Sequence, residues 1–408
     1  MNDMRKDVNE IVDQLVKDIN PYDSVIKAMN GLSFSDGRII IVAIGKAAWT
    51  MASAAASCLK DREYEGAVIT KYGHSQGPIA NLEIFEAGHP LVAENSLKAT
   101  SFVLNMTEGL CGNGTVIFLV SGGGSALFEK PRIAFKDLQN INDILLKCGA
   151  DIKEINTIRK KLSEVKGGRF GQHCKPARVV SIILSDVLGD DLSTIASGPA
   201  VVDSTGIDDA LSIIKKYGLP IDADAIEGEP VSELDNVENV MIGSVRMLCD
   251  FAKVKCEELG YDTTIIESDC SEDANDVADR LSSIAAKNQD STRSLAFIIG
   301  GETTVKVTGN GLGGRNQQLA LRTAKGIEGF KDTCIFAFAS DGTDGPTDEA
   351  GGYVDGETMD RLKKKNIDID AYLENNDSYH ALKMIDGLIH TGPTGSNVND
   401  AYVLLIRR

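Results

Sequence analysis

The chain has 408 residues, enough for roughly two or three domains with cores of their own. Its formal net charge of −18 excludes a protein that grips nucleic acid through the phosphate backbone, because that needs clustered lysine and arginine. A hydrophobic content of 42% without a long apolar run also predicts no membrane-spanning segment.

The eight cysteines and five histidines form no recognisable metal or disulfide pattern. No two cysteines have the CxxC spacing, and the histidines lack the HExxH spacing of zinc enzymes. Residues 1–18 are charged throughout, which predicts no signal peptide. We therefore expect reduced cysteines and a cytoplasmic protein.

The first expected elements are helices followed by a buried strand. Apolar residues recur with helical spacing over residues 1–29, with a break at Pro21, and this region either covers a sheet or forms a dimer contact. Residues 38–45 read RIIIVAIG, which fits a strand buried on both faces of a parallel sheet. Lys46 follows at the carboxyl end of this strand, before a helix over 47–60, and this place favours a functional role.

A glycine loop follows the third expected strand. The second strand is expected over residues 66–70 and a turn over 86–90, where His89 is either a substrate contact or a structural histidine. The third, over 115–120, runs straight into SGGGS. Such a loop between a buried strand and a helix suits anion binding, with a flexible turn as the alternative. The candidate residues are Ser121, Gly122, Gly123, Gly124 and Ser125.

A basic segment and then two aspartates follow along the sequence. Residues 156–171 form a basic island containing Gly-Gly-Arg169, which is either a loop that meets anionic groups or the end of a solvated helix face. A fourth strand over 178–186 ends at Asp186, and Asp190 lies shortly after it. Because Mg²⁺ prefers oxygen ligands, these two aspartates are the candidate metal ligands, with ordinary turn chemistry as the alternative.

An acidic, turn-rich stretch over residues 206–237 marks the expected domain boundary. We divide the chain into an N-terminal domain, residues 1–232, and a C-terminal domain, residues 233–408, whose last helix or strand is free to return to the first domain. After the boundary we expect strands over 240–243 and 263–266 and helices over 244–260 and 271–289.

The richest stretch lies between residues 296 and 324. A buried strand leads to Glu302, a β-branched alternating run over 303–308 follows, and GNGLGG then precedes a helix over 316–324. Glycine loops let backbone N–H groups approach an anion, a helix N-terminus adds a favourable dipole, and an arginine grips phosphate or carboxylate with two hydrogen bonds. The candidate residues here are Glu302, Gly314, Arg315 and Asn316.

Two further loops follow late strands. The strand over residues 334–339 ends in SDGTDG, where Asp341 and Asp344 are either functional or turn residues. A glycine and hydroxyl loop over 390–400 precedes a final strand over 402–406. Buried strands with helices between them predict an α/β fold, in which ligands bind at the carboxyl ends of the strands, and a site built from two such domains would lie in the cleft between them.

The inventory of side chains favours phosphoryl transfer. GNGLGG satisfies the GxGxxG pattern of dinucleotide folds, but the run before it is short and no acidic residue ends a second strand some twenty positions on. No Ser/His/Asp or Cys/His constellation is present. Phosphoryl transfer needs cations around the moving phosphate and carboxylates for metal, so the residues indicate a kinase acting on a small acidic substrate.

Several long motifs resemble the glycerate 2-kinase family with a C-terminal MOFRL domain, over nearly the whole chain and in the same order. They read IGKAAWTM, SGGGSALFEKP, LSDVLGDDLSTIASGPAVVDST, GGETTVKVTGNGLGGRNQQLAL and SDGTDGPTDEAGG. The resemblance implies a larger Rossmann-like domain with a parallel sheet and a smaller C-terminal α/β domain, with the active site in the cleft. It also implies ATP- and Mg²⁺-dependent phosphorylation of D-glycerate to 2-phosphoglycerate.

The family's essential lysine and arginine correspond to Lys46 in IGKAA and Arg315 in GGRNQ. We expect these cations to neutralise the transferring phosphoryl group or the glycerate carboxylate, and Glu302 to orient Arg315. The expected partners are D-glycerate and ATP, without nucleic acid or membrane and with a homodimer left open. The rival hypotheses are an NAD(P)H-dependent hydroxypyruvate reductase and a non-catalytic nucleotide or organic-acid sensor.

Overall fold

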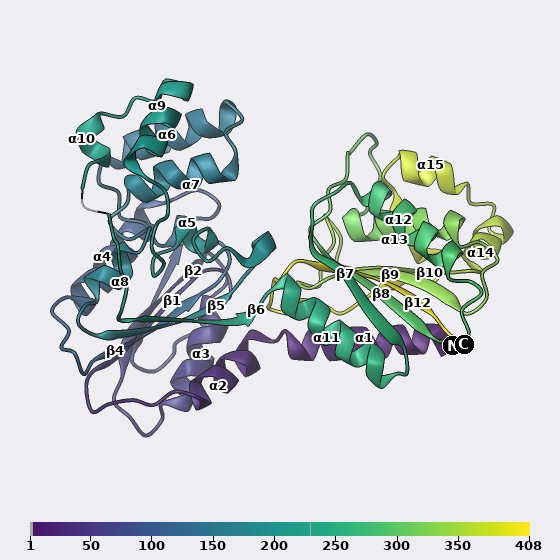
Figure 1. The fold of residues 1–408 in the computed structure, drawn as a ribbon, viewed down its shortest axis with the longest axis horizontal. Coiled ribbons are helices and arrows are strands. Elements are labelled where there is room, and N and C mark those ends of the chain that lie inside the picture. Colours follow the sequence, from purple (N-terminus) through teal and green to yellow (C-terminus); the bar gives the residue numbers. More distant parts are fainter. Residues whose placement is uncertain (1–2, 229) are drawn as a thin grey trace. The chain divides into compact units, whose positions relative to one another are not determined.

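The computed structural model describes residues 3–228 and 230–408, which form two compact units (Figure 1). One unit is Pro21–Ile242, called here the parallel unit. The other combines the residues up to Asn20 with Gly243–Arg408 and is called the mixed unit. The division falls after residue 242 rather than between residues 232 and 233, and the start of the chain belongs with its C-terminal part.

The parallel unit is built on a six-stranded sheet with the order β3-β2-β1-β4-β5-β6. This order is typical of Rossmann-like folds, and the pairs β2–β3, β1–β2, β1–β4 and β4–β5 are all parallel. Because β1 and β4 are buried along their whole length, they read as continuous apolar runs. The strands are β1 (Ile39–Ile44), β2 (Glu65–Lys71), β3 (Leu82–Ala87), β4 (Thr115–Val120), β5 (Arg178–Leu184) and β6 (Val237–Gly243).

The helices of the parallel unit fall into two groups. One group packs around the sheet, and α6, α7, α9 and α10 contribute to a separate apolar cluster that includes Leu138, Ile158 and Ile213. In α3 the indole N–H of Trp49 donates to the Gly77 carbonyl at 2.8 Å. The helices are α2 (Pro21–Asn30), α3 (Ala48–Cys58), α4 (Glu94–Thr107), α5 (Gly124–Leu127), α6 (Phe135–Lys147), α7 (Ile152–Lys161), α8 (Arg169–His173), α9 (Ile207–Tyr217) and α10 (Ala223–Ile226), with short 3₁₀ turns at Leu188–Asp190 and Ile195–Ser197.

The mixed unit has a second six-stranded sheet with the order β11-β10-β9-β12-β8-β7. The last strand of the chain, β12, lies inside this sheet and runs antiparallel to both of its neighbours, β8 and β9. It therefore does not return to the first domain. The strands are β7 (Asp262–Cys270), β8 (Leu295–Gly301), β9 (Thr333–Ala339), β10 (Gly351–Asp355), β11 (Leu388–Ile389) and β12 (Asp400–Ile406).

Helices cover both faces of the mixed sheet (Figure 1). The first helix packs here because its apolar stripe, which includes Val8, Ile11 and Leu15, is fully buried. The hydroxyl of Tyr261 also donates to Asp7 Oδ2 at 2.5 Å. The helices are α1 (Asp3–Asp18), α11 (Val245–Glu258), α12 (Ala274–Lys287), α13 (Arg315–Gly326), α14 (Thr358–Lys364), α15 (Ile369–Glu374) and α16 (Ser378–Lys383).

The predicted α/β class, with a Rossmann-like parallel sheet and a second α/β unit, is confirmed. The alternating run over residues 303–308 is not a strand, and only Thr304 forms an isolated bridge, with Asp273. The N–H of Thr303 donates instead to the Tyr402 hydroxyl and that of Thr308 to the Asn376 side chain. Among the helices in the described parts of the chain, none is long and apolar enough to cross a membrane.

Candidate active site

Two loops meet at the carboxyl edge of the parallel sheet because β1 and β4 are neighbouring parallel strands. Lys46 follows β1, and the Ser121–Gly124 loop follows β4. The backbone N–H of Lys46 donates to the Gly122 carbonyl at 2.9 Å, and that of Ala47 donates to Ser121 Oγ at 3.1 Å. The structure thus brings the predicted lysine and the predicted glycine loop into direct contact.

The glycines of these loops are required by close packing. Gly45 has φ +114°, and a Cβ there would lie 2.2 Å from Ser121 Oγ. A Cβ on Gly122 would lie 2.0 Å from Oδ2 of Asp186. The Asp186 carboxylate, which follows β5, therefore lies directly against the glycine loop.

The two loops carry groups that suit an anion. Within the described part of the parallel unit, and Asp186 aside, no residue accepts a hydrogen bond from the N–H groups of Gly122 and Gly123. With the same exception, no carboxylate there forms an ion pair with the Lys46 ammonium. Lys46 is half-buried. This combination suits a phosphate or carboxylate group.

Asp190, one of the two candidate metal ligands, differs in its surroundings from its neighbour Asp191. Asp190 has φ +52°, and its Oδ1 is buried without a hydrogen-bond partner, so an oxygen suited to a hard cation is present. Both carboxylate oxygens of Asp191 have hydrogen-bond partners, because they accept from Ser193 N–H and Thr194 Oγ1, each at 2.9 Å. Burial opposes ionisation of Asp191, but these hydrogen bonds prevail and lower its pKa.

Most of the basic island is paired inside the parallel unit. Lys160 and Lys161 bind Asp203 at 3.3 and 2.9 Å, and the fully buried Lys166 ammonium pairs with Glu129. These three lysines therefore stabilise the fold.

Arg169 is tied to the backbone of the same region. Its Nη1 donates to the carbonyls of Lys160 at 2.7 Å and Lys166 at 3.3 Å. Burial, followed by the charge of Arg132, lowers the pKa of the Arg169 guanidinium. Ser125 lies beside a neighbouring turn, with its Oγ 3.1 Å from Ser197 Oγ.

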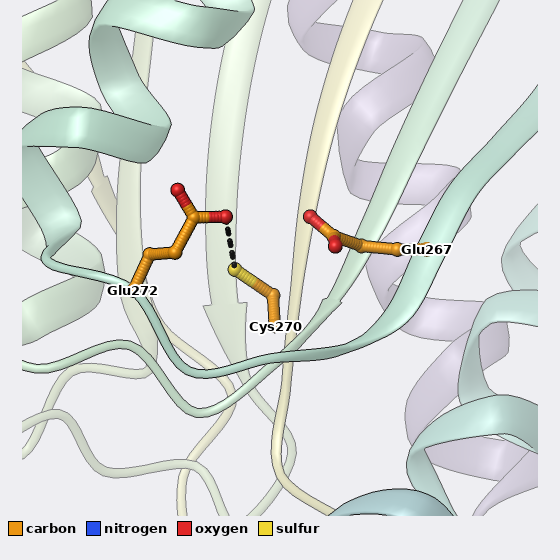
Figure 2. A group of neighbouring side chains, drawn as sticks. All are labelled: Glu267, Cys270 and Glu272. Atoms are coloured by element: carbon orange, nitrogen blue, oxygen red, sulfur yellow. Dashed lines mark hydrogen bonds between the residues drawn. The ribbon is translucent and has the colours of Figure 1, made fainter.

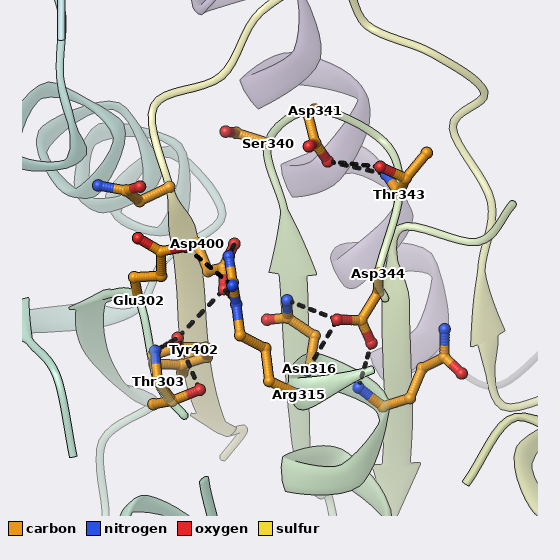
Figure 3. A network of polar contacts seen from close by, with 12 residues as sticks. Glu302, Thr303, Arg315, Asn316, Ser340, Asp341, Thr343, Asp344, Asp400 and Tyr402 are labelled. Carbon is orange, nitrogen blue, oxygen red and sulfur yellow. Dashed lines mark hydrogen bonds and ion pairs between the residues drawn. The ribbon is translucent and has the colours of Figure 1, made fainter. Parts of the chain in front are cut away.

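In the mixed unit a network of polar side chains surrounds Arg315 (Figure 3). Asp400 opens β12 and pairs in register with Gly301 at the end of β8 and Ala339 at the end of β9. Arg315 donates to Asp400 through Nε at 2.6 Å and Nη2 at 3.3 Å, and to Glu302 through Nη1 at 2.9 Å. Glu302 thus contacts Arg315 as the sequence predicted.

The network keeps Arg315 charged and partly accessible. Burial raises the pKa of Asp400, which the Arg315 charge opposes. Burial lowers the pKa of Arg315, but Asp400 and Glu302 outweigh it, so the net shift is upwards. Three of the five guanidinium N–H groups are used, and the other two can meet a ligand. The Arg315 side chain is 31% exposed.

The sequence did not single out Asp400, Tyr402 or Thr303. The Tyr402 hydroxyl donates to Asp400 Oδ2 at 3.3 Å and accepts from the Thr303 hydroxyl, whose Oγ1 lies 3.1 Å away, which completes the support of the carboxylate. Asp400 was not predicted because functional residues were expected at the carboxyl ends of strands. The antiparallel strand β12 brings its amino end to the edge where β8 and β9 end. The signal was present as a buried aspartate at the head of an apolar run.

The glycine loop before α13 does not offer the row of free N–H groups that the GxGxxG pattern predicts. The N–H groups of residues 308–312 all donate to residues 375–377, including Gly309 to Asn376 Oδ1 at 2.9 Å and Gly311 to the Asn375 carbonyl at 2.9 Å. A pyrophosphate would have to displace these bonds. The loop is therefore fastened within the unit, which argues against a dinucleotide site.

The N-terminus of α13 is occupied by the chain's own carboxylate. Asp344 Oδ1 accepts from the N–H of Asn316 at 3.1 Å, and its Oδ2 accepts from that of Gln317 at 2.8 Å. The helix dipole that we expected to favour a ligand anion thus favours Asp344. Asp341 makes a turn by accepting from Thr343 N–H at 2.9 Å, so both aspartates have structural roles.

Glu267, Cys270 and Glu272 form a second group of potential metal ligands, shown in Figure 2. Arg280 already fills this group, because it pairs with Glu267 and with Glu272, the latter at 3.0 Å. The guanidinium supplies the positive charge that a metal would bring. We therefore assign the group to stability.

Comparison with known proteins shows which families and relatives this chain resembles. Residues 7–227 match the model of a domain of unknown function, DUF4147, and residues 295–400 match that of the MOFRL family. A D-glycerate 2-kinase of Thermotoga maritima is 46% identical over 99% of this chain and 98% of its own. A relative in Agrobacterium vitis, 34% identical over 98% of this chain and 94% of its own, carries a hydroxypyruvate reductase name.

The crystal structure of a glycerate kinase from Thermotoga maritima covers 99% of both chains, with a TM-score of 0.94 and 47% identity. Fold, strand-end loops and family models together define a two-unit α/β protein with a MOFRL-type second unit. The chain belongs to the glycerate 2-kinase family.

The capping carboxylate of α13 gives a pH-dependent prediction. Burial raises the pKa of Asp344 to about 7, against the N–H donors that lower it. Between about pH 4 and pH 7 the folded state therefore binds more protons than the unfolded state, and this group's stabilisation is lost as pH rises. We expect Asp344→Asn to be most destabilised relative to wild type at pH 5 and less so at pH 8.

Urea unfolding followed by circular dichroism at both pH values measures this difference, with Asp341→Asn as the control for a change in the same loop. A variant that instead falls further behind wild type as pH rises would mean that the helix N-terminus holds the pKa of Asp344 below its ordinary value.

Proposed function

We propose that this protein transfers the γ-phosphoryl group of ATP to the 2-hydroxyl of D-glycerate, forming 2-phosphoglycerate and ADP in the cytoplasm. The supporting relatives align over nearly the whole chain, both units included. The observation that carries the chemistry is the direct contact of Lys46 with the glycine loop after β4, with the Asp186 carboxylate against the same loop. The eight free cysteines are consistent with a reducing compartment.

In this proposal Lys46 and the Ser121–Ser125 loop hold the anionic oxygens of phosphate or glycerate. The attacking hydroxyl oxygen forms a bond to the γ-phosphorus as the bond to the β,γ-bridging oxygen breaks, and the hydroxyl proton is released. Negative charge on the transferring group and on ADP must be stabilised, so fixed cations and N–H dipoles lower the barrier.

Arg315 provides a second, directional donor. Asp400 and Glu302 fix the guanidinium plane, so its two remaining N–H groups are oriented before substrate arrives. Preorganised donors stabilise a transition state without a reorganisation cost. We assign Arg315 to the phosphoryl group or the glycerate carboxylate.

Asp186 and Asp190 would hold Mg²⁺. The buried Oδ1 of Asp190 without a hydrogen-bond partner and the Asp186 carboxylate against Gly122 supply the oxygen donors that this ion prefers. When bound, the ion neutralises phosphate charge during transfer.

Phosphorus NMR of the protein with ATP, Mg²⁺ and D-glycerate tests the proposal. A growing 2-phosphoglycerate signal alongside ADP is the expected result. A 3-phosphoglycerate signal would overturn the position of attack. NADH oxidation with hydroxypyruvate, without any phosphorylated product, would favour the reductase.

Replacing either catalytic cation should remove transition-state stabilisation. We expect Lys46→Ala and Arg315→Ala each to lower kcat/KM about 100- to 1,000-fold, on the scale of one lost positioned donor. The controls are Lys130→Ala, which removes a surface ion pair with Glu164, and Arg322→Ala on the same helix as Arg315. Near-normal turnover of a folded Lys46→Ala or Arg315→Ala protein would refute the role of that cation.

Asp400 should matter through the position of Arg315. Asp400→Asn keeps the shape but weakens two hydrogen bonds to the guanidinium, and we expect kcat to fall about 10- to 100-fold. Asp355 offers a matched control, since it is also buried, pairs with Arg361 at 2.7 Å and accepts from Tyr353 at 3.1 Å.

Steady-state kinetics and thermal unfolding of Asp400→Asn and Asp355→Asn distinguish a role in positioning Arg315 from a role in the stability of the fold. Both variants should lose stability, but only Asp400→Asn should lose kcat. Equal losses of kcat in the two variants would show that Asp400 serves the fold alone.

A further inference from the structure

Three neighbouring strands of the parallel sheet are followed at their carboxyl ends by basic or ionisable side chains. Lys46 follows β1, Lys71 ends β2 with His74 close behind, and His89 follows β3. These strands are neighbours in the sheet and run parallel, so their ends lie along one edge. Such a gathering is notable in a chain whose formal net charge is −18.

His89 borders the glycine loop directly. A Cβ on Gly123 would lie 2.9 Å from Cδ2 and 3.0 Å from Nε2 of the His89 ring, and 3.5 Å from Cγ of Lys46. The imidazole and the lysine stem therefore lie against the same glycine. The Nδ1 of His74 lies 3.3 Å from the Lys46 carbonyl and supports the backbone at this point.

The groups around His89 disfavour a positive charge on its ring. Burial lowers the pKa of His89, and Lys46, Lys71 and His74 lower it further in that order. The Asp186 carboxylate lies on the other side of the loop, against Gly122. The nearby Glu86 accepts from the N–H groups of the turn after β2. An arriving anion would relieve the repulsion among these cations.

We propose that His89 contacts substrate and joins Lys46 and the Gly123 N–H in a subsite for an anionic group, either the carboxylate of glycerate or a phosphate of the nucleotide. This subsite lies wholly within the parallel unit and rests on the proposed function for the identity of the anion. The imidazole gains a proton when the anion binds, because the nearby negative charge favours the charged ring.

NMR of the intact protein with labelled histidine side chains tests the subsite. The chain has five histidines, and the signal lost in His89→Gln identifies the one of interest. The ring is titrated with pH in the free protein, with saturating D-glycerate and, separately, with a non-hydrolysable ATP analogue. One ligand should raise the pKa of His89, while the signal of His173, half-buried in the same unit, should not move when ligand is added at fixed pH.

Four outcomes separate the two proposals. A response to glycerate alone assigns the subsite to the carboxylate, and a response to the analogue alone assigns it to phosphate. Calorimetric binding of both ligands without any change at His89 overturns the subsite but leaves the kinase. Absence of binding by either ligand overturns both.

Kinetics provide a second measurement. His89→Gln should raise KM about tenfold for the ligand that NMR identifies and leave KM for the other within about twofold, on the scale of one charged hydrogen bond. His173→Gln is the matched control, since its Nε2 contacts the Leu104 carbonyl at 3.0 Å and its ring stacks on Phe170. Equal KM changes in the two variants would contradict a substrate contact.

Discussion

The buried ion pair between Asp400 and Arg315 unites the elements of the mixed unit's functional edge. A carboxylate is expensive to bury unless it is paired and hydrogen-bonded, and Asp400 is nearly inaccessible at the head of β12. Arg315 from α13 and Tyr402 from β12 satisfy it, and Tyr402 in turn fixes Thr303 after β8. If any of these elements moved, the buried Asp400 carboxylate would lose a partner, and the cost of its desolvation would no longer be offset.

The two units hold their key cations by different physical means. Arg315 is compensated by two carboxylates, so its long-range field is small and its value lies in the direction of its N–H groups. Lys46 lies near Lys71, His74 and His89, which gather positive or ionisable groups around it, so it attracts anions over distance. Arg315 is therefore suited to orienting a bound anion, and Lys46 is suited to attracting it.

The sequence predicted what depends on local pattern. The apolar runs of β1 and β4, and the junctions at Lys46 and Ser121, follow from residues adjacent in the chain. What depended on distant partners was missed: the loop before α13 is fastened by residues 375–377, and the α13 N-terminus is capped by Asp344. The edge strand β3 also escaped notice, since half-exposed LEIFEA has no continuous apolar run. No local pattern records which remote group will satisfy a donor.

The order of the chain has a consequence for synthesis. The parallel unit is encoded between α1 and α11, so it can fold while the ribosome is still producing the mixed unit. The mixed sheet must wait for β12, the last strand to emerge, which fills the place between β8 and β9. Until then these two strands present open edges that invite wrong pairing. The nascent protein is thus most vulnerable to aggregation between the emergence of β9 and that of β12, and a chaperone would help it most in that interval.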